Sequence, residues 1–153
     1  MKLDIFDKKI LALLQRDNRI SQRELSVEVN LSASAINRRI ATMEKAGVIK
    51  NSVTVVNSHK VGRPITIITQ VSLINERLDL LEKLKKNFTN CPQVQQVYYV
   101  TGDFDFLLII NVRDMEEYER LTHELFFKSE NIQSFKTFVS MQNAKQELTV
   151  FLG

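Results

Sequence analysis

The chain has 153 residues, of which 44% are hydrophobic and 25% charged, so it is long enough for one or two small domains with a real core. Its apolar runs reach only strand length, which predicts no membrane-spanning helix, and Asp4 and Asp7 interrupt any signal-peptide core. The single cysteine, Cys91, excludes an internal disulfide framework and is typical of a reducing cytoplasm.

The net charge of +3 is unevenly distributed along the chain. Residues 1–62 carry eleven Lys/Arg and six Asp/Glu, whereas residues 63–153 carry ten and twelve. A basic excess is what a phosphate-binding surface requires, and the acidic remainder argues against nucleic-acid contact by the second half. Because asymmetries of this size also arise by chance, the charge alone assigns no function.

A first helix is predicted over residues 4–16, with Asp4 as its N-cap. Its apolar residues recur at helical spacing and form one inner face: Phe6, Ile10, Leu13 and Leu14. The pair Asp17-Asn18 ends the helix.

Residues 21–50 predict two further helices with a tight turn between them. Ser21 and Glu24 have the spacing of a capping box, and Ser32 is a natural N-cap for the second of these helices. Asn30 lies where the chain must turn, and asparagine tolerates a left-handed backbone better than most residues.

The last of the three helices, about residues 32–45, has one apolar and one polar side, and Gly47 ends it. The inward residues are Ile36, Ile40 and Met43. The outward residues are Ser34, Asn37 and Arg38. A short, propped helix of this kind is typical of a helix-turn-helix, in which Arg and Asn can read guanine and adenine edges in the major groove. The same pattern also fits an ordinary helical hairpin with a solvated basic face.

Beyond the helices, residues 51–60 are β-prone with partial alternation. We therefore expect an extended linker strand over 51–62 that could pair with a copy of itself. Gly62 and Pro64 break it.

The second half alternates between strand and helix patterns. Strands are predicted at 65–74, 94–100, 104–112 and 132–141, helices at 77–88 and 114–127, and a short final strand or tail at 148–152. The order βαββαβ predicts an α+β chain in which a three-helix helix-turn-helix domain is joined by the linker strand to a ferredoxin-like domain. That domain has an antiparallel sheet with both helices on one face.

Residues 106–110 are apolar at every position. A strand with one face in water should alternate, so continuous apolarity predicts that both faces are buried. In so small a domain, the second face most easily packs against another subunit. We therefore expect a symmetric homodimer, which also suits a DNA reader with two half-sites.

Residues along the whole chain match one family pattern. In the first half they are Leu3, Asp4, Asp7, Ile10, Leu11, Leu14, Gln15, Asp17, Arg19, Ile20, Ser21, Glu24, Leu25, Leu31, Ser32, Arg39, Glu44, Gly47, Val48 and Ile49. In the second half they form the run Thr101–Leu107, which contains a G-x-[YF]-D turn. On these residues the chain resembles the leucine-responsive regulator/asparagine-regulator (Lrp/AsnC) family of transcription factors. Departures at Ser26, Asn30 and Met43 are mild.

The resemblance implies a cytoplasmic, nucleoid-associated transcription regulator of amino-acid or related metabolism. Its domains would be a DNA-binding domain (1–50, motif 22–41), the linker (51–62), and a RAM-type domain (63–153). The RAM-type domain would form homodimers, often rings of dimers. It would also bind a small effector, commonly an amino acid, between protomers near the Gly–Asp turn.

The resemblance places double-stranded DNA against the second and third helices. The expected contact residues are Ser21, Gln22, Ser32, Ser34, Asn37, Arg38 and Arg39. Ser34, Asn37 and Arg38 would lie near base edges or phosphates, whereas Ser21, Gln22 and Ser32 lie at helix N-termini, which favour phosphate. Arg39 could equally serve packing or a salt bridge, because it neighbours the inward Ile40.

The expected effector residues are Thr101, Gly102, Asp103, Phe104 and Asp105. Gly102 permits a turn that other residues would strain, and exposed backbone N–H groups there could hold a carboxylate. Asp105 could hold an ammonium, so the turn suits an amino-acid zwitterion. A plain hairpin turn capped by Asp105 has equal weight.

The sequence shows no Gly-rich phosphate loop, metal-ligand spacing or nucleophile–His–acid set, so no catalytic residue, metal or cofactor is expected. His59 and His123 are isolated. Siroheme decarboxylases resemble this family in both domains, but the helix that carries Asn37 and Arg38 favours DNA. A sequence-independent DNA-architectural protein is the other alternative.

Overall fold

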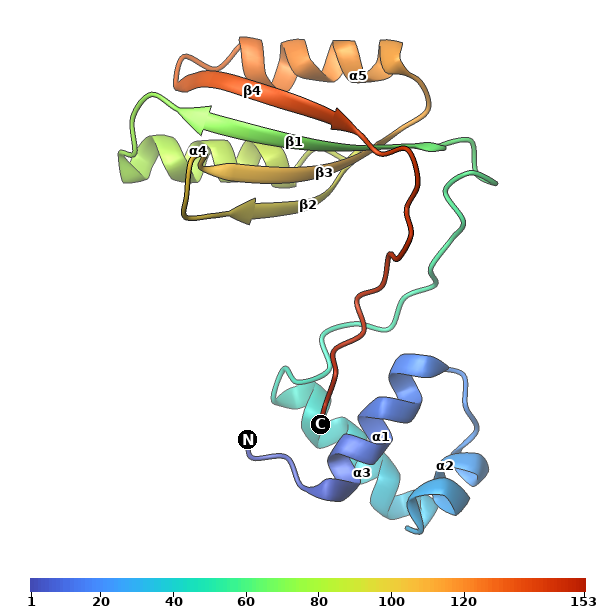
Figure 1. Cartoon of the computed structure of the whole chain (residues 1–153). Helices are drawn as coiled ribbons and strands as arrows, with labels where there is room; N and C mark the ends of the chain where they lie inside the picture. Colours follow the sequence, from blue (N-terminus) through green and yellow to red (C-terminus); the bar gives the residue numbers. More distant parts are fainter. The chain divides into compact units, whose positions relative to one another are not determined.

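A computed structural model describes all 153 residues, which form two compact units (Figure 1). The first unit comprises residues 1–55 together with 146–153, and the second comprises residues 56–145. None of the helices is both long and apolar enough to cross a membrane.

Three helices build the first unit: α1 (Ile5–Arg16), α2 (Gln22–Val29) and α3 (Ala33–Lys45). All three contribute to one small core, whose buried members are Ile10, Leu11, Leu25, Val29, Ile36 and Met43. The three predicted helices are therefore confirmed, as is the inward side of the third, on which Ile36 and Met43 are fully buried.

Side-chain caps begin each of these helices. The carboxylate of Asp4 accepts from the backbone N–H of Asp7 at 2.8 Å, and the carboxylate of Asp7 accepts from the backbone N–H of Asp4 at 3.1 Å. Ser21 and Glu24 make the predicted capping box, with bonds of 3.1 and 2.9 Å. Asn30 has φ 59°, the left-handed conformation that the turn before α3 requires.

The predicted linker strand over 51–62 is wrong for the single chain. Residues 51–57 have no regular secondary structure, and residues 58–62 form turns. A β-strand needs a neighbour to pair its backbone groups, and no segment of this chain pairs with the linker. For the same reason the β-prone residues 148–152 form a tail and not a strand.

The tail nevertheless docks within the first unit, although the sequence placed it in the second domain. The side-chain amide of Gln15 on α1 donates to the carbonyl of Val150 at 3.1 Å and accepts from its N–H at 2.7 Å. Leu152 packs against the core of the three helices. The side-chain amide of Gln15 thus hydrogen-bonds to both backbone groups of Val150.

Replacing Leu152 by serine should lower the free energy of unfolding of the first unit by about 1 kcal/mol, because the apolar contacts of this partly buried leucine are lost. Hydrogen exchange of the α1 backbone amides should accelerate accordingly. Leu148→Ser is the matched control, because Leu148 is 81% exposed and should not change the exchange. Equal exchange in both variants would mean that the tail does not hold α1.

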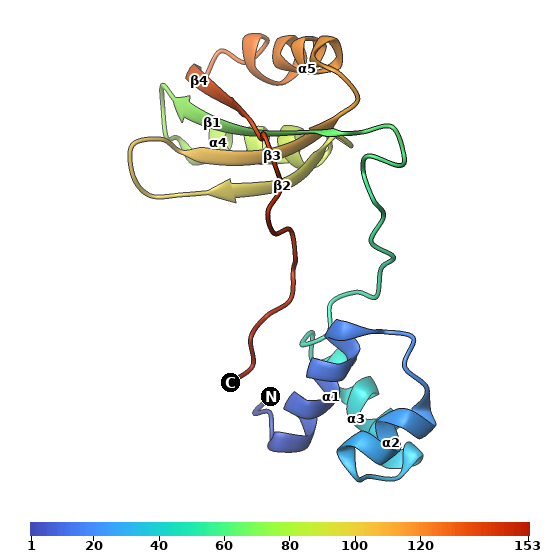
Figure 2. The ribbon, with the colours of Figure 1, turned by 45° about the vertical axis from the view of Figure 1, so that its right-hand side comes forward.

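The second unit has the predicted βαββαβ order. Its strands are β1 (Ile65–Leu73), β2 (Val94–Tyr99), β3 (Phe106–Val112) and β4 (Ile132–Val139). Its helices are α4 (Leu78–Thr89) and α5 (Met115–Thr122), the latter extended by a π-helical turn over His123–Phe127. The strands form one antiparallel sheet in the order β2-β3-β1-β4 (Figure 2).

Helices α4 and α5 cover the same face of this sheet. On that face Ile67 pairs with Ile110, and Val71 pairs with Phe106, all fully buried. Phe88 of α4 meets Phe106 edge-on with ring centroids 5.4 Å apart. The core of the unit therefore lies between this face and the two helices.

Neither helix covers the opposite face of the sheet. Ile68 pairs with Ile109 there and both are only partly buried, while Tyr98 and Phe138 at its sides are 47% and 48% exposed. The apolar residues 106–110 of β3 thus alternate between a core that the chain completes and a face that no helix covers.

Candidate DNA-binding and effector sites

The outward face of α3 offers side chains that the chain itself does not use. Ser34, Asn37 and Arg38 are exposed and lie at i, i+3 and i+4, so they share one face of the helix. Neither the amide of Asn37 nor the guanidinium of Arg38 makes a hydrogen bond or ion pair within the chain. Ser32 caps the helix by accepting from the N–H of Ala35, and its hydroxyl lies 3.1 Å from that of Ser34.

Arg39 behaves differently from its neighbour Arg38. Its Nη1 donates to Asp4 and Asp7 at 2.8 Å each, and its guanidinium lies over the ring of Phe6 at 5.5 Å. Asp7 is only 3% exposed, so its ion pair with Arg39 lies where α1 packs against α3. The backbone N–H of Asp7 and then the Arg39 guanidinium lower the pKa of the Asp4 carboxyl. Of the two interpretations of Arg39, the geometry favours the salt bridge.

The start of α2 is already partly occupied. The hydroxyl of Ser21 donates to Glu24 at 2.7 Å, and this bond, with the Ser21 backbone N–H, lowers the pKa of the Glu24 carboxyl. Gln22 is exposed and makes no side-chain hydrogen bond. Arg23 beside it is equally exposed and unpaired. Arg23 is not among the contact residues expected from the sequence, although its position in the first turn of α2 could have been found there.

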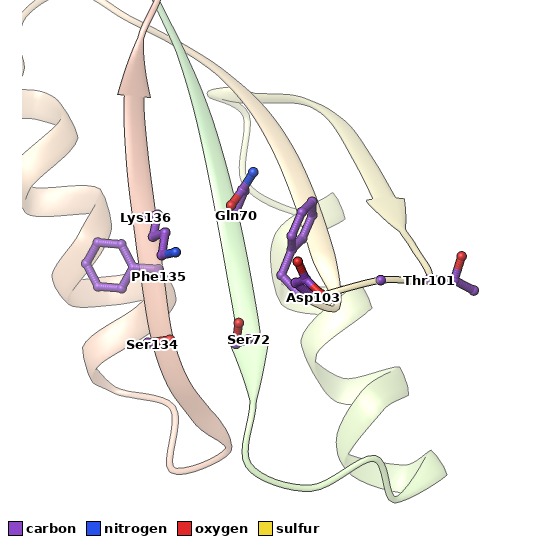
Figure 3. Close-up of a pocket in the computed structure, with 9 residues that line it drawn as sticks. Gln70, Ser72, Thr101, Asp103, Ser134, Phe135 and Lys136 are labelled. Atoms are coloured by element: carbon purple, nitrogen blue, oxygen red, sulfur yellow. The ribbon is translucent and has the colours of Figure 1, made fainter.

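A pocket of about 230 Å³ opens on the uncovered face of the sheet (Figure 3). Four of the five predicted effector residues line it: Thr101, Gly102, Asp103 and Phe104, from the loop between β2 and β3. The other lining residues come from neighbouring strands. They are Gln70 and Ser72 of β1, and Ser134, Phe135 and Lys136 of β4.

The strand residues were not predicted, because the sequence does not show which strands are neighbours. In register, Gln70 lies opposite Lys136, and Ser72 lies opposite Ser134. The available signal was the alternation of β1 and β4, where polar residues occupy open-face positions of otherwise apolar strands. Phe135 points to the other side of β4 in Figure 3, where its ring stacks on that of Phe126 at 4.6 Å.

The loop that lines the pocket has unpaired backbone donors. The N–H groups of residues 101–104 make no hydrogen bond within the chain, and Gly102 has φ 126°, a conformation that side chains disfavour. Asp103 and Lys136 line the same pocket with opposite charges and no ion pair. Backbone donors, a carboxylate and an ammonium together can hold both charged ends of an amino acid.

Asp105 does not line this pocket. Its carboxylate accepts from the N–H of Leu73 at 2.7 Å, its own N–H donates to Val71 at 2.9 Å, and its carbonyl accepts from Val100 at 2.8 Å. Two of these bonds fasten the loop to β1, and the bond from Val100 closes the loop on itself. Asp105 therefore positions the loop, and the carboxylate that lines the pocket is that of Asp103.

Three helices with a free polar face, and a βαββαβ unit with a pocket, define a DNA-binding regulator with an effector domain. Comparison with known sequences gives the same class. The Lrp/AsnC ligand-binding domain matches residues 66–150, and a winged helix-turn-helix DNA-binding domain matches residues 3–50. An uncharacterized HTH-type transcriptional regulator of Sinorhizobium fredii is 41% identical over 98% of this chain and 89% of its own.

Solved structures extend the similarity to the whole chain. An AsnC family transcriptional regulator from Agrobacterium tumefaciens superposes with a TM-score of 0.91 at 28% identity, covering 97% of this chain and 96% of its own. A transcriptional regulator of Neisseria meningitidis, solved in complex with L-Met, gives 0.90 at 25% identity with the same coverage. The chain belongs to the Lrp/AsnC family of transcription regulators. The resemblance found in the sequence, and the α+β fold that it implied, are thereby confirmed.

Proposed function

We propose that this chain regulates transcription as a homodimer whose DNA affinity responds to an amino acid bound in the pocket beside residues 101–104. The DNA-binding domain would be residues 1–50 with the docked tail 146–153, and the effector domain residues 63–145, joined by the linker 51–62. The protein would act in the cytoplasm on nucleoid DNA and without catalysis. The alternative as a tetrapyrrole-processing enzyme has no comparable support.

The observation that carries the proposal is the set of polar groups that the fold leaves unused. Asn37 and Arg38 extend from α3 without partners, where they can form bidentate contacts with base edges. In the second unit, the unpaired backbone N–H groups of residues 101–104 and the Asp103 carboxylate are groups that would hold the two charged ends of a zwitterion, and Lys136 lines the same pocket. The Neisseria relative holds an amino acid, L-Met, which supports a ligand of the same class here.

Support for a homodimer comes from the open face of the sheet. Ile68, Leu107 and Ile109 lie at its centre and are only partly buried, with exposed Tyr98 and Phe138 beside them. An apolar surface of this kind is typical of a protein interface. A second copy packed on this face would also cover the pocket. The linker of the second copy would then be a pairing partner for the unpaired backbone of the first linker.

The test is selection of bound duplexes from a random-sequence DNA library, with and without a pool of the common amino acids. An enriched, roughly palindromic motif is the expected result, since a symmetric dimer reads two half-sites. A change in affinity or motif with the pool would support the effector. Binding without enrichment would indicate an architectural protein, and no binding at low salt would contradict the proposal.

A further inference from the structure

Lys136 is the only basic side chain that lines the pocket. It lies on β4 directly opposite Gln70 of β1, and both point to the open face of the sheet (Figure 3). Neither side chain has a hydrogen-bond or ion-pair partner within the chain. An ammonium and an amide thus stand side by side on the floor of the pocket, with the hydroxyls of Ser72 and Ser134 next to them.

The two charged ends of an amino-acid zwitterion can be held without Lys136 and Gln70. Its carboxylate is matched by the free N–H groups of residues 101–104, and its ammonium is matched by the carboxylate of Asp103. Lys136 and Gln70 come from the strands and not from the loop, so they are left to meet the ligand's side chain. The pocket of about 230 Å³ is below the range of about 300–1,000 Å³ that is typical of drug-sized ligands, which fits a small molecule.

The chemistry of this floor disfavours an aliphatic side chain. A leucine or methionine side chain placed there would strip water from the Lys136 ammonium and give it no partner, which is costly. Two aromatic residues line the pocket: Phe104 comes from the loop, and Phe135, on the strand side, turns its ring away from the floor and packs on Phe126. A ligand carboxylate would instead accept from Lys136 and Gln70 together.

We propose that the pocket selects an amino acid with an acidic side chain, read by Lys136 and Gln70. This rests on the proposed function, because it names the ligand class of the same effector pocket. Selectivity would come from the side-chain carboxylate, because glutamine has the same shape as glutamate but lacks the charge that Lys136 requires.

The test is calorimetric titration of the full-length protein with L-glutamate, L-aspartate, L-glutamine, L-leucine and L-methionine. We expect glutamate or aspartate to bind at least about tenfold more tightly than glutamine, as a charge-assisted hydrogen bond predicts. Lys136→Met should abolish this preference, and Lys136→Arg should largely keep it. Lys128→Met is the matched control, since Lys128 is exposed and does not line the pocket.

The outcomes separate this inference from the proposed function. Tight binding of leucine or methionine with no preference for an acidic ligand would overturn the acidic selectivity and leave the effector site in place. A preference for glutamate that survives Lys136→Met would overturn the role of Lys136. Binding of none of the five amino acids, together with intact DNA binding, would overturn both the inference and the effector part of the proposed function.

Discussion

Replacing Arg38 by alanine should weaken binding to the selected DNA site by about ten- to a hundredfold per half-site, as expected for a lost bidentate base contact. Thermal stability should not change, because the Arg38 side chain is exposed and makes no hydrogen bond or ion pair within the chain. Fluorescence anisotropy with a labelled duplex measures the loss. Repeating it over a range of salt concentrations distinguishes the two kinds of contact. Loss of a phosphate contact reduces the salt slope by about one, whereas loss of a base contact relaxes sequence preference.

The adjacent arginine provides the matched variant. Arg39→Ala removes both hydrogen bonds to Asp4 and Asp7 and leaves the nearly buried Asp7 without its cation, so it should destabilise the three helices. Any loss of DNA affinity in this variant should follow that unfolding. Arg120→Ala, on α5 of the other unit, should change neither property. If Arg38→Ala binds DNA normally, the outward face of α3 is not the reading surface.

What the sequence predicted well depends on residues close together in the chain. The capping box of Ser21 and Glu24 and the cap at Asp4 each join groups three residues apart, and the left-handed turn at Asn30 depends on a single residue. Such contacts are determined by local geometry and spacing. The same holds for the helical and strand periodicities, which gave the order βαββαβ.

What the sequence missed depends on which segments become neighbours. The pocket combines the loop at 101–104 with residues of β1 and β4. Gln70 and Lys136 are 66 residues apart in the chain, and only the register of β1 on β4 brings them next to each other. The role of Arg39 required the position of α1, and the docking of Val150 on Gln15 spans 135 residues. Asp105 follows the family motif, but its bond to Leu73 shows that it holds the loop to β1.

The linker shows a different limit. Its β-prone residues specify a strand only if a partner supplies the other half of the ladder. One chain contains no such partner, so residues 51–57 remain without regular structure. The exposed apolar face of β3 and its neighbouring strands is a second example. The apolar sequence pattern predicts that both faces of the strand are buried, and a single chain does not bury the second face.

A second large effect is expected at Glu117, which joins three segments of the βαββαβ unit. Its carboxylate accepts from the backbone N–H of Arg113 at 2.7 Å, from Gln93 at 3.1 Å and from Arg63 at 3.1 Å, and the residue is 8% exposed. Glu117→Gln keeps the size but places an amide N–H₂ among these donors. We expect it to lower the free energy of unfolding of this unit by about 2–3 kcal/mol at neutral pH.

The pH dependence of that loss identifies its cause. The Arg113 backbone N–H, then Gln93 and Arg63, lower the pKa of Glu117 despite the opposing effect of burial. A carboxyl whose pKa is lower in the folded state stabilises fully above its unfolded pKa of about 4.3, and the stabilisation disappears as pH falls through the folded pKa. Wild type and Glu117→Gln should therefore differ most at neutral pH and converge in acid.

Urea unfolding followed by tyrosine fluorescence measures the stability of the second unit selectively. The chain has no tryptophan, and its three tyrosines, Tyr98, Tyr99 and Tyr118, all lie in that unit. Glu116→Gln is the matched control, since the side chain of Glu116 is 79% exposed and its pair with Arg120 is a surface pair of little worth. A difference between wild type and Glu117→Gln that persists unchanged into acid would mean that packing, and not the ionised carboxylate, holds the three segments together.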